Sequence, residues 1–280
     1  MVRSIAVVSL GIMLMLVAGC GSSEKATNLT GEDRFNHAKR LFDSEDFLEA
    51  INEFTVITLQ DQGSKYASEA QFYIAECRFK RGEYLLAAFE YSVLKRSYPA
   101  SPRVPEAQYR LGLCYYDLSP KPSLDQQYTK KAIDELQSFV EYYPSNPLAA
   151  DADAKIKELT TKLARKLYEA AKQYLTLERY KAALAYLEDV IEQYHDTEYG
   201  PLAALDRVEL LIERKRYPEA QTELSRFISR YPNSVLRGRA DTLQERLTRE
   251  ASGTPGVKGK GTANLSPLGN PPRNDLQSTI

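Results

Sequence analysis

The chain of 280 residues has no tryptophan, only two histidines and only three cysteines. So few imidazole and thiol groups exclude zinc sites, haem attachment motifs and disulfide scaffolds, which need more ligands or paired cysteines. Neither sign of charge dominates, since 37 Lys and Arg face 38 Asp and Glu, and this balance excludes the basic footprint of a nucleic-acid binder. A hydrophobic share of 43% is enough to bury a core. Without tryptophan, 19 tyrosines and 9 phenylalanines supply the aromatic side chains.

The first twenty residues have the features of an export signal. Arg3 precedes an apolar run over residues 5–18, and these 14 residues are fewer than the roughly 20 that span a bilayer as a helix. Residues 16–20, Leu-Val-Ala-Gly-Cys, resemble the lipobox of bacterial lipoproteins, which implies cleavage and acylation at Cys20. An ordinary signal peptide that ends near a cysteine is the alternative. We expect a lipoprotein signal peptide at 1–19 and a flexible, lipidated tether at 20–30.

The middle of the chain contains an internal repeat. Alanine anchors recur at spacings of 37, 45, 51 and 37 residues: Ala50, Ala87, Ala132, Ala183 and Ala220. Four of them follow an aromatic residue by three positions: Phe47, Tyr84, Tyr180 and Tyr217. A bulky residue stands four positions after each anchor: Phe54, Tyr91, Leu136, Leu187 and Leu224. Tyrosine, usually followed by proline, stands eleven positions after four anchors: Tyr98, Tyr143, Tyr194 and Tyr231.

This pattern predicts two antiparallel helices per repeat. Alanine lets helices approach closely, the bulky residue fills the space beside it, and proline ends the second helix. The pattern resembles the tetratricopeptide repeat. We therefore predict an all-α tetratricopeptide-repeat solenoid of five helix-turn-helix units over residues 31–250, with a loop inserted in the third unit near 119–123 and one long helix, or two nearly fused ones, over 148–177. The glycine- and proline-rich residues 251–280 are expected to form a disordered tail.

No pattern typical of catalysis is present. The sequence contains no nucleophile elbow, glycine-rich phosphate loop or cluster with metal-ligand spacing. His37 and His195 are interpreted as structural residues. Cys77 and Cys114 occupy equivalent repeat positions, so they either pair across neighbouring helices or serve as small core residues. We expect no enzymatic activity, no cofactor and no metal.

Aromatic residues also form a stripe on the first helix of each of the first three repeats. Each helix carries two of them seven positions apart, hence on one face. The six residues are Phe35, Phe42, Phe72, Phe79, Tyr109 and Tyr116. One interpretation is a trough that binds an extended substrate peptide, because aromatic rings bury area at low entropic cost. The alternative is that the rings pack between successive repeats.

These features together resemble the BamD family, the lipoproteins of the outer-membrane β-barrel assembly (BAM) complex. The resemblance rests on the lipobox at Cys20, the five repeats, the repeated Tyr-Pro-x-Ser at 98–101 and 231–234, the insertion in the third repeat and the long helix before the fourth anchor. It covers about residues 16–250. His195 departs from it, since it stands where the other repeats have proline.

The resemblance implies a scaffold on the periplasmic face of the outer membrane, lipid-anchored through Cys20. It implies a BamA-like β-barrel insertase as partner, bound through its periplasmic POTRA region by the C-terminal repeats. Unfolded outer-membrane proteins would bind to the N-terminal repeats, and other BAM lipoproteins are possible partners. The alternative function is a periplasmic tetratricopeptide-repeat adaptor in envelope maintenance or division, linked to the Tol system.

Overall fold

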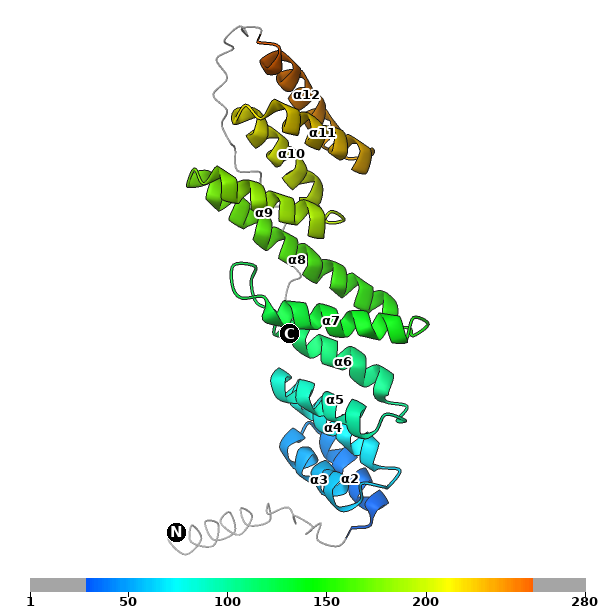
Figure 1. Ribbon diagram of the computed structural model, residues 1–280. Coiled ribbons are helices and arrows are strands. Elements are labelled where there is room, and N and C mark those ends of the chain that lie inside the picture. The colour runs from blue at the N-terminus through cyan, green and yellow to red at the C-terminus, as the bar shows by residue number, and fades with distance from the viewer. Residues whose placement is uncertain (1–28, 254–280) are drawn as a thin grey trace, which may run out of the picture. The chain divides into compact units, whose positions relative to one another are not determined.

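The computed structural model describes residues 29–253 (Figure 1). The signal peptide at 1–19, Cys20, most of the tether and the tail from residue 254 lie outside the described residues. All regular elements within 29–253 are helices: α2 (Gly31–Asp43), α3 (Phe47–Gln60), α4 (Ala67–Lys80), α5 (Tyr84–Ser97), α6 (Val104–Asp117), α7 (Gln127–Tyr142), α8 (Ala149–Thr176), α9 (Tyr180–Gln193), α10 (Tyr199–Glu213), α11 (Tyr217–Arg230) and α12 (Arg237–Ala251).

The helices form five helix-turn-helix repeats, from α2 with α3 to α10 with α11, and α12 packs against α10 and α11. The predicted all-α repeat architecture is confirmed. The chain divides into two compact units, one up to Glu169 and one from Ala170. We describe each unit by itself.

The alanine anchors lie in the second helix of each repeat and all five are fully buried. The bulky residues four positions later are also fully buried, and they include the ring of Tyr91 in α5 and that of Phe54 in α3. The anchor Ala87 shares a core with Phe72 and Ala75 of α4. The residues of the repeated pattern are thus those through which the two helices of each repeat contact one another.

Both ends of the second helices are determined locally. The aromatic residue three positions before the anchor is the first residue of α3, α5, α9 and α11. The tyrosine of the Tyr-Pro or Tyr-His pair is the C-cap of α5, α7, α9 and α11. The turn before four of these helices requires a left-handed residue five positions ahead of the anchor. Glycine occupies this position only in the second repeat, and the four residues are Glu45, Gly82, Glu178 and Lys215.

The third repeat has the predicted loop between α6 and α7. Gln126, which is buried, holds the loop by donating hydrogen bonds to the carbonyls of Lys121 (2.8 Å) and Leu124 (3.0 Å). Its own amide oxygen accepts a bond from Thr129 (2.7 Å). The predicted long helix is also present, as the 28 residues of α8.

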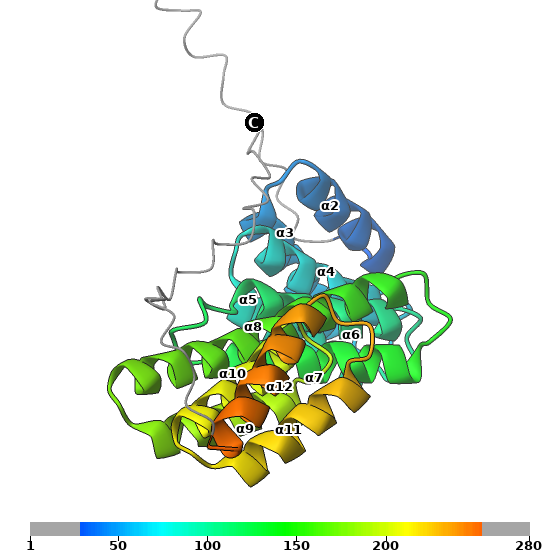
Figure 2. The same ribbon diagram turned by 90° about the horizontal axis from the view of Figure 1, so that it is seen from above.

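The core of the first unit consists of successive buried clusters, one for each pair of neighbouring repeats. Cys77 lies in the cluster around Phe54, and Cys114 in the cluster around Tyr91. Both cysteines are free and buried, so they act as small core residues. In the second unit, the neighbouring helices from α9 to α12 pack against one another (Figure 2), and their buried residues include Leu187, Leu205 and Phe227.

No helix within residues 29–253 combines the length and the apolar composition that crossing a membrane requires.

Candidate functional site

The six stripe aromatics lie on α2, α4 and α6, the first helices of the first three repeats. Phe72 and Tyr109 are buried, at 3% and 7% exposure, whereas the other four are half-buried. Phe72 contacts the ring of Tyr91 at 5.9 Å, and Tyr109 contacts that of Phe139 at 5.4 Å. The stripe is therefore a layer of packed rings and not an open row of exposed ones.

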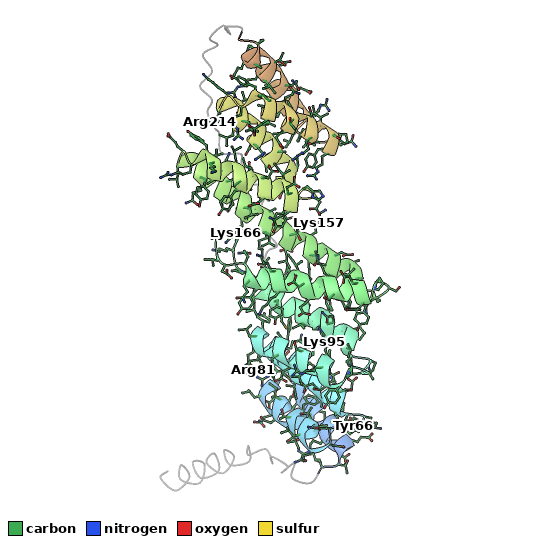
Figure 3. The ribbon with its side chains drawn as sticks, in the orientation of Figure 1. Tyr66, Arg81, Lys95, Lys157, Lys166 and Arg214 are labelled. Carbon is green, nitrogen blue, oxygen red and sulfur yellow. The ribbon has the colours of Figure 1, made fainter. Side chains whose placement is uncertain are left out.

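The first repeat contributes the most extensive ring contacts. Phe35 stacks on Tyr66 at 5.3 Å and meets Phe54 edge-on at 5.6 Å. Phe42 meets Tyr73 of α4 edge-on at 5.1 Å, and Tyr73 also stacks on Phe54 at 5.4 Å. Tyr66 and Arg81 are the cap residues at the two ends of α4, and Figure 3 shows them on opposite sides of the ribbon.

Cations from a following first helix cover the solvent side of the rings. The guanidinium of Arg103 lies 4.8 Å from the centre of the Phe72 ring, and that of Arg110 lies 5.6 Å from the Phe79 ring. Lys155 of α8 covers Tyr116 at 4.7 Å. Cations placed over aromatic faces are attracted by the ring quadrupole.

Carboxylates complete this surface. Arg103 binds both carboxylate oxygens of Glu69, at 2.9 and 3.0 Å, and Arg110 pairs with the buried Glu76 at 3.1 Å. The phenol of Tyr109 donates to Asp151, and the phenol of Tyr116 donates to Glu158 at 2.6 Å.

Burial, followed by the hydrogen bond to Glu158 and its negative charge, raises the pKa of Tyr116 to about 12. Burial and Asp151 likewise raise the pKa of Tyr109. We name the side of the first helices α2, α4, α6 and α8 that carries these rings, cations and carboxylates the A-helix face.

The A-helix face has partly exposed hydrogen-bond donors and acceptors that lie over the layer of packed aromatic rings. Side chains of Arg103, Arg110 and Lys155 keep between a quarter and a third of their surface accessible. Such groups can exchange their present partners for backbone carbonyls or a terminal carboxylate of a peptide.

Sequence reasoning missed the cations and Tyr73. Arg103 and Arg110 are seven residues apart, as the covered rings Phe72 and Phe79 are. This matching spacing on neighbouring first helices is the signal that could have indicated them.

The second unit has an open groove between α9 and α11, with a volume of about 550 Å³, lined by Glu192, Arg226, Ser229 and Arg230. Arg230 donates to the carbonyl of Ile191 at 3.1 Å. Arg226 instead lies 3.5 to 3.7 Å from the carboxylates of Glu188, Glu192 and Glu223. Its charge is thus shared among three acids, without a short hydrogen bond to any of them.

His37 lies in α2 and His195 in the turn after α9. Within residues 29–253, no group of three or more His, Cys, Asp or Glu side chains is arranged to hold a metal ion.

Comparison with known families identifies the chain. The sequence profile of a family described as outer membrane lipoprotein matches residues 28–213, about two thirds of the chain. The chain belongs to this family of outer membrane lipoproteins. A tetratricopeptide-repeat profile also matches residues 203–234. The lipoprotein profile includes all six stripe residues, and the repeat profile includes Arg226 and Arg230 of the groove.

Among individual relatives, the chain is similar to two proteins named outer membrane protein assembly factor BamD. It is 26% identical over 198 residues to that of Caulobacter vibrioides, covering 69% of this chain and 65% of the relative. It is 26% identical over 222 residues to that of Rickettsia prowazekii, covering 79% and 88%. A solved structure of the TPR2AB domain of yeast Sti1 in an Hsp90 complex matches with a TM-score of 0.40 and 17% identity, covering 79% of this chain and 86% of that one.

Proposed function

We propose that this outer membrane lipoprotein is a non-enzymatic scaffold for the assembly and insertion of β-barrel proteins. The observation that carries this proposal is its family membership, together with relatives named as outer membrane protein assembly factors. These similarities favour barrel assembly over the Tol-linked adaptor. In this proposal, acyl chains on Cys20 hold the repeats at the periplasmic face of the membrane, because two or three chains anchor a protein stably.

A pull-down tests the function as a whole. The tagged, acylated chain is isolated from gently solubilised outer membranes, and the proteins bound to it are identified by mass spectrometry. A β-barrel insertase with repeated periplasmic domains is the expected main partner. Tol-system proteins as the main partners would move the function to the adaptor alternative.

For substrate binding, we propose the A-helix face of the first three repeats. An unfolded barrel strand that ends in an aromatic residue offers a ring, backbone carbonyls and a terminal carboxylate. The terminal aromatic ring of the strand can pack against the partly exposed rings of the face, which are Phe35, Phe42, Phe79 and Tyr116. The terminal carboxylate of the strand can pair with Lys39 or Lys155, which cover Phe42 and Tyr116. Phe72 and Tyr109 are buried, so in this proposal they pack beneath the partly exposed rings and do not contact the peptide.

Charge reversal tests this face without disturbing its core. Lys155→Glu should weaken binding of a synthetic alternating polar and apolar peptide with a terminal phenylalanine by about tenfold, which corresponds to about 1.4 kcal/mol. Lys181→Glu, an equal charge change at an exposed site on α9, is the control and should bind normally. Equal affinities of the two folded variants, measured by calorimetry, would sink the assignment.

For insertase binding, we propose the groove between α9 and α11 of the second unit. Arg226 is the nominated contact, because a partner carboxylate can replace its three long ion pairs with a short one. Arg226→Glu should lose the insertase from the pull-down. Arg249→Glu, the same charge change at an exposed site on α12, should retain it.

A further inference from the structure

The second helices of the first two repeats expose large apolar side chains. Leu85, Leu86 and Phe89 of α5 are 52%, 49% and 60% exposed, and Leu48 of α3 is 55% exposed. On α5 the three side chains cover one face, opposite the buried anchor Ala87. We name Leu85, Leu86 and Phe89 the outer face of α5.

Packing of the repeats does not require apolar residues at these positions. The equivalent positions of α7 carry Lys130, Lys131 and Asp134, and all three are exposed. Those of α11 carry Pro218, Glu219 and Thr222, which are also exposed. The same backbone positions are therefore solvated by polar side chains in later repeats, and apolar outer residues gather in the repeats that follow the N-terminal tether.

The tether brings this part of the chain close to the membrane. Gly31, the first residue of α2, is eleven positions after Cys20, so the chain between them spans at most about 40 Å when extended. A helix of 14 residues is about 21 Å long, and packed helices lie about 8 to 10 Å apart. All of α5 therefore lies within reach of a bilayer surface that holds acylated Cys20.

Charges at the border of the outer face suit lipid headgroups. Arg96 lies seven residues after Phe89 and thus on the same side of α5, while Lys80 ends α4 just before the turn. Both are exposed, and neither forms an ion pair within the described part of the chain. Long cationic side chains beside apolar ones can reach phosphate groups while their stems stay in the interface. Leu48 of α3 instead has the acidic residues Asp46 and Glu49 beside it, which disfavours its insertion among phosphate groups. We therefore take α5 as the inserting helix and place Leu48 at the edge of the contact.

We propose that the outer face of α5 docks onto the phospholipid surface to which the chain is tethered. Leu85, Leu86 and Phe89 enter the interface, and Arg96 and Lys80 contact headgroup phosphates. This inference rests on the proposed acylation of Cys20. A lipid anchor at a single residue leaves the first unit free to rotate, whereas a second contact determines its orientation. Because Ala87 packs against α4 and α6 on the other side of α5, docking keeps the first helices turned away from the bilayer.

Site-directed fluorescence on the acylated, full-length protein tests the docking. An uncharged fluorophore is attached to Phe89→Cys, and the protein is reconstituted into phosphatidylethanolamine and phosphatidylglycerol vesicles that contain a nitroxide-bearing lipid quencher. The matched control carries the label at Asp134→Cys, the same exposed repeat position in α7. We expect quenching at position 89 to be at least about threefold stronger than at 134. Adding Leu85→Glu and Leu86→Glu should reduce it to the control level.

Each outcome is distinguishable. A protein that floats with the vesicles but is quenched equally at both positions is anchored without docking, and this overturns the inference alone. Failure to float overturns the proposed acylation instead. If other membrane proteins shield the label at position 89 from the quencher, the outer face is a protein interface. If the label is shielded in vesicle-free solution at high protein concentration, the outer face is a self-contact. Either result would overturn lipid docking.

Discussion

Gly112 of α6 and Leu136 of α7 pack so closely that no side chain fits between them. A Cβ atom on Gly112 would lie 2.6 Å from Cδ2 of Leu136 and 2.7 Å from its Cγ. Leu136 is the bulky residue four positions after the anchor Ala132, and it is fully buried. Gly112 stands where the first helices of the earlier repeats have the buried alanines Ala38 and Ala75, so the backbone of α6 approaches the leucine side chain directly.

Gly112→Ala should destabilise the fold by about 1 to 3 kcal/mol, because overpacking forces the leucine or the helix to move. Urea unfolding measures the change. Gly238→Ala in α12 is the matched control, since a Cβ there meets no atom within 4 Å, and alanine should stabilise that helix by about 0.5 to 1 kcal/mol. Destabilisation by both variants would contradict the packing argument.

The left-handed turn residues predict stability changes of opposite sign. Gly82 has a φ of 73° and no atom near its missing Cβ, so Gly82→Ala should cost about 1 kcal/mol through backbone strain alone. Lys215, with a φ of 58°, stands at the equivalent turn before α11. Lys215→Gly should raise the free energy of unfolding by up to about 1 kcal/mol, because relief of the strain exceeds the added chain entropy. Denaturation midpoints of the two variants check the prediction.

The tyrosines of the first unit predict loss of stability in alkaline solution. Burial and the neighbouring carboxylates raise the pKa of Tyr91, Tyr109 and Tyr116 in the folded state. In the unfolded chain tyrosine ionises near pH 10, so the folded protein binds more protons above that pH and its stability falls as the pH rises. Ultraviolet titration should show Tyr116 ionising near pH 12, and Tyr116→Phe should remove that step and weaken the pH dependence. An unchanged titration curve in Tyr116→Phe would contradict the assignment.

The two core cysteines should be inert in the native protein. Burial is the main reason that the pKa of Cys77 is raised to about 12, and it raises the pKa of Cys114 as well. Because the thiolate is the reactive form, we expect neither thiol to react with a disulfide reagent until denaturant is added, when both should react. Native reaction of one thiol would mean that its repeat opens locally. No free thiol after denaturation would mean that the cysteines are paired.

Local patterns were sufficient to predict the repeat architecture. The anchors act between the two helices of one repeat, and the aromatic first residues and the Tyr-Pro ends act within one helix or one turn. The boundaries of each repeat can therefore be predicted from its own residues. The long α8 and the loop held by Gln126 were equally visible, because one lacks glycine and proline and the other contains two prolines. The acylation predicted at Cys20 is also read from a local motif, although that residue lies outside the described part of the chain.

The candidate site was only partly predictable. Spacing placed Phe72 and Phe79 on one face of α4, but spacing along one helix cannot show what lies against that face. The two rings are covered by Arg103, the N-cap of α6, and by Arg110 within α6, each 31 residues after the ring that it covers. The sequence by itself determined the helices and their pairing, and it predicts the export signal, since these depend on neighbours in the chain. Only the tertiary structure decided which rings are buried and which cations cover them, because those contacts depend on how one repeat packs against the next.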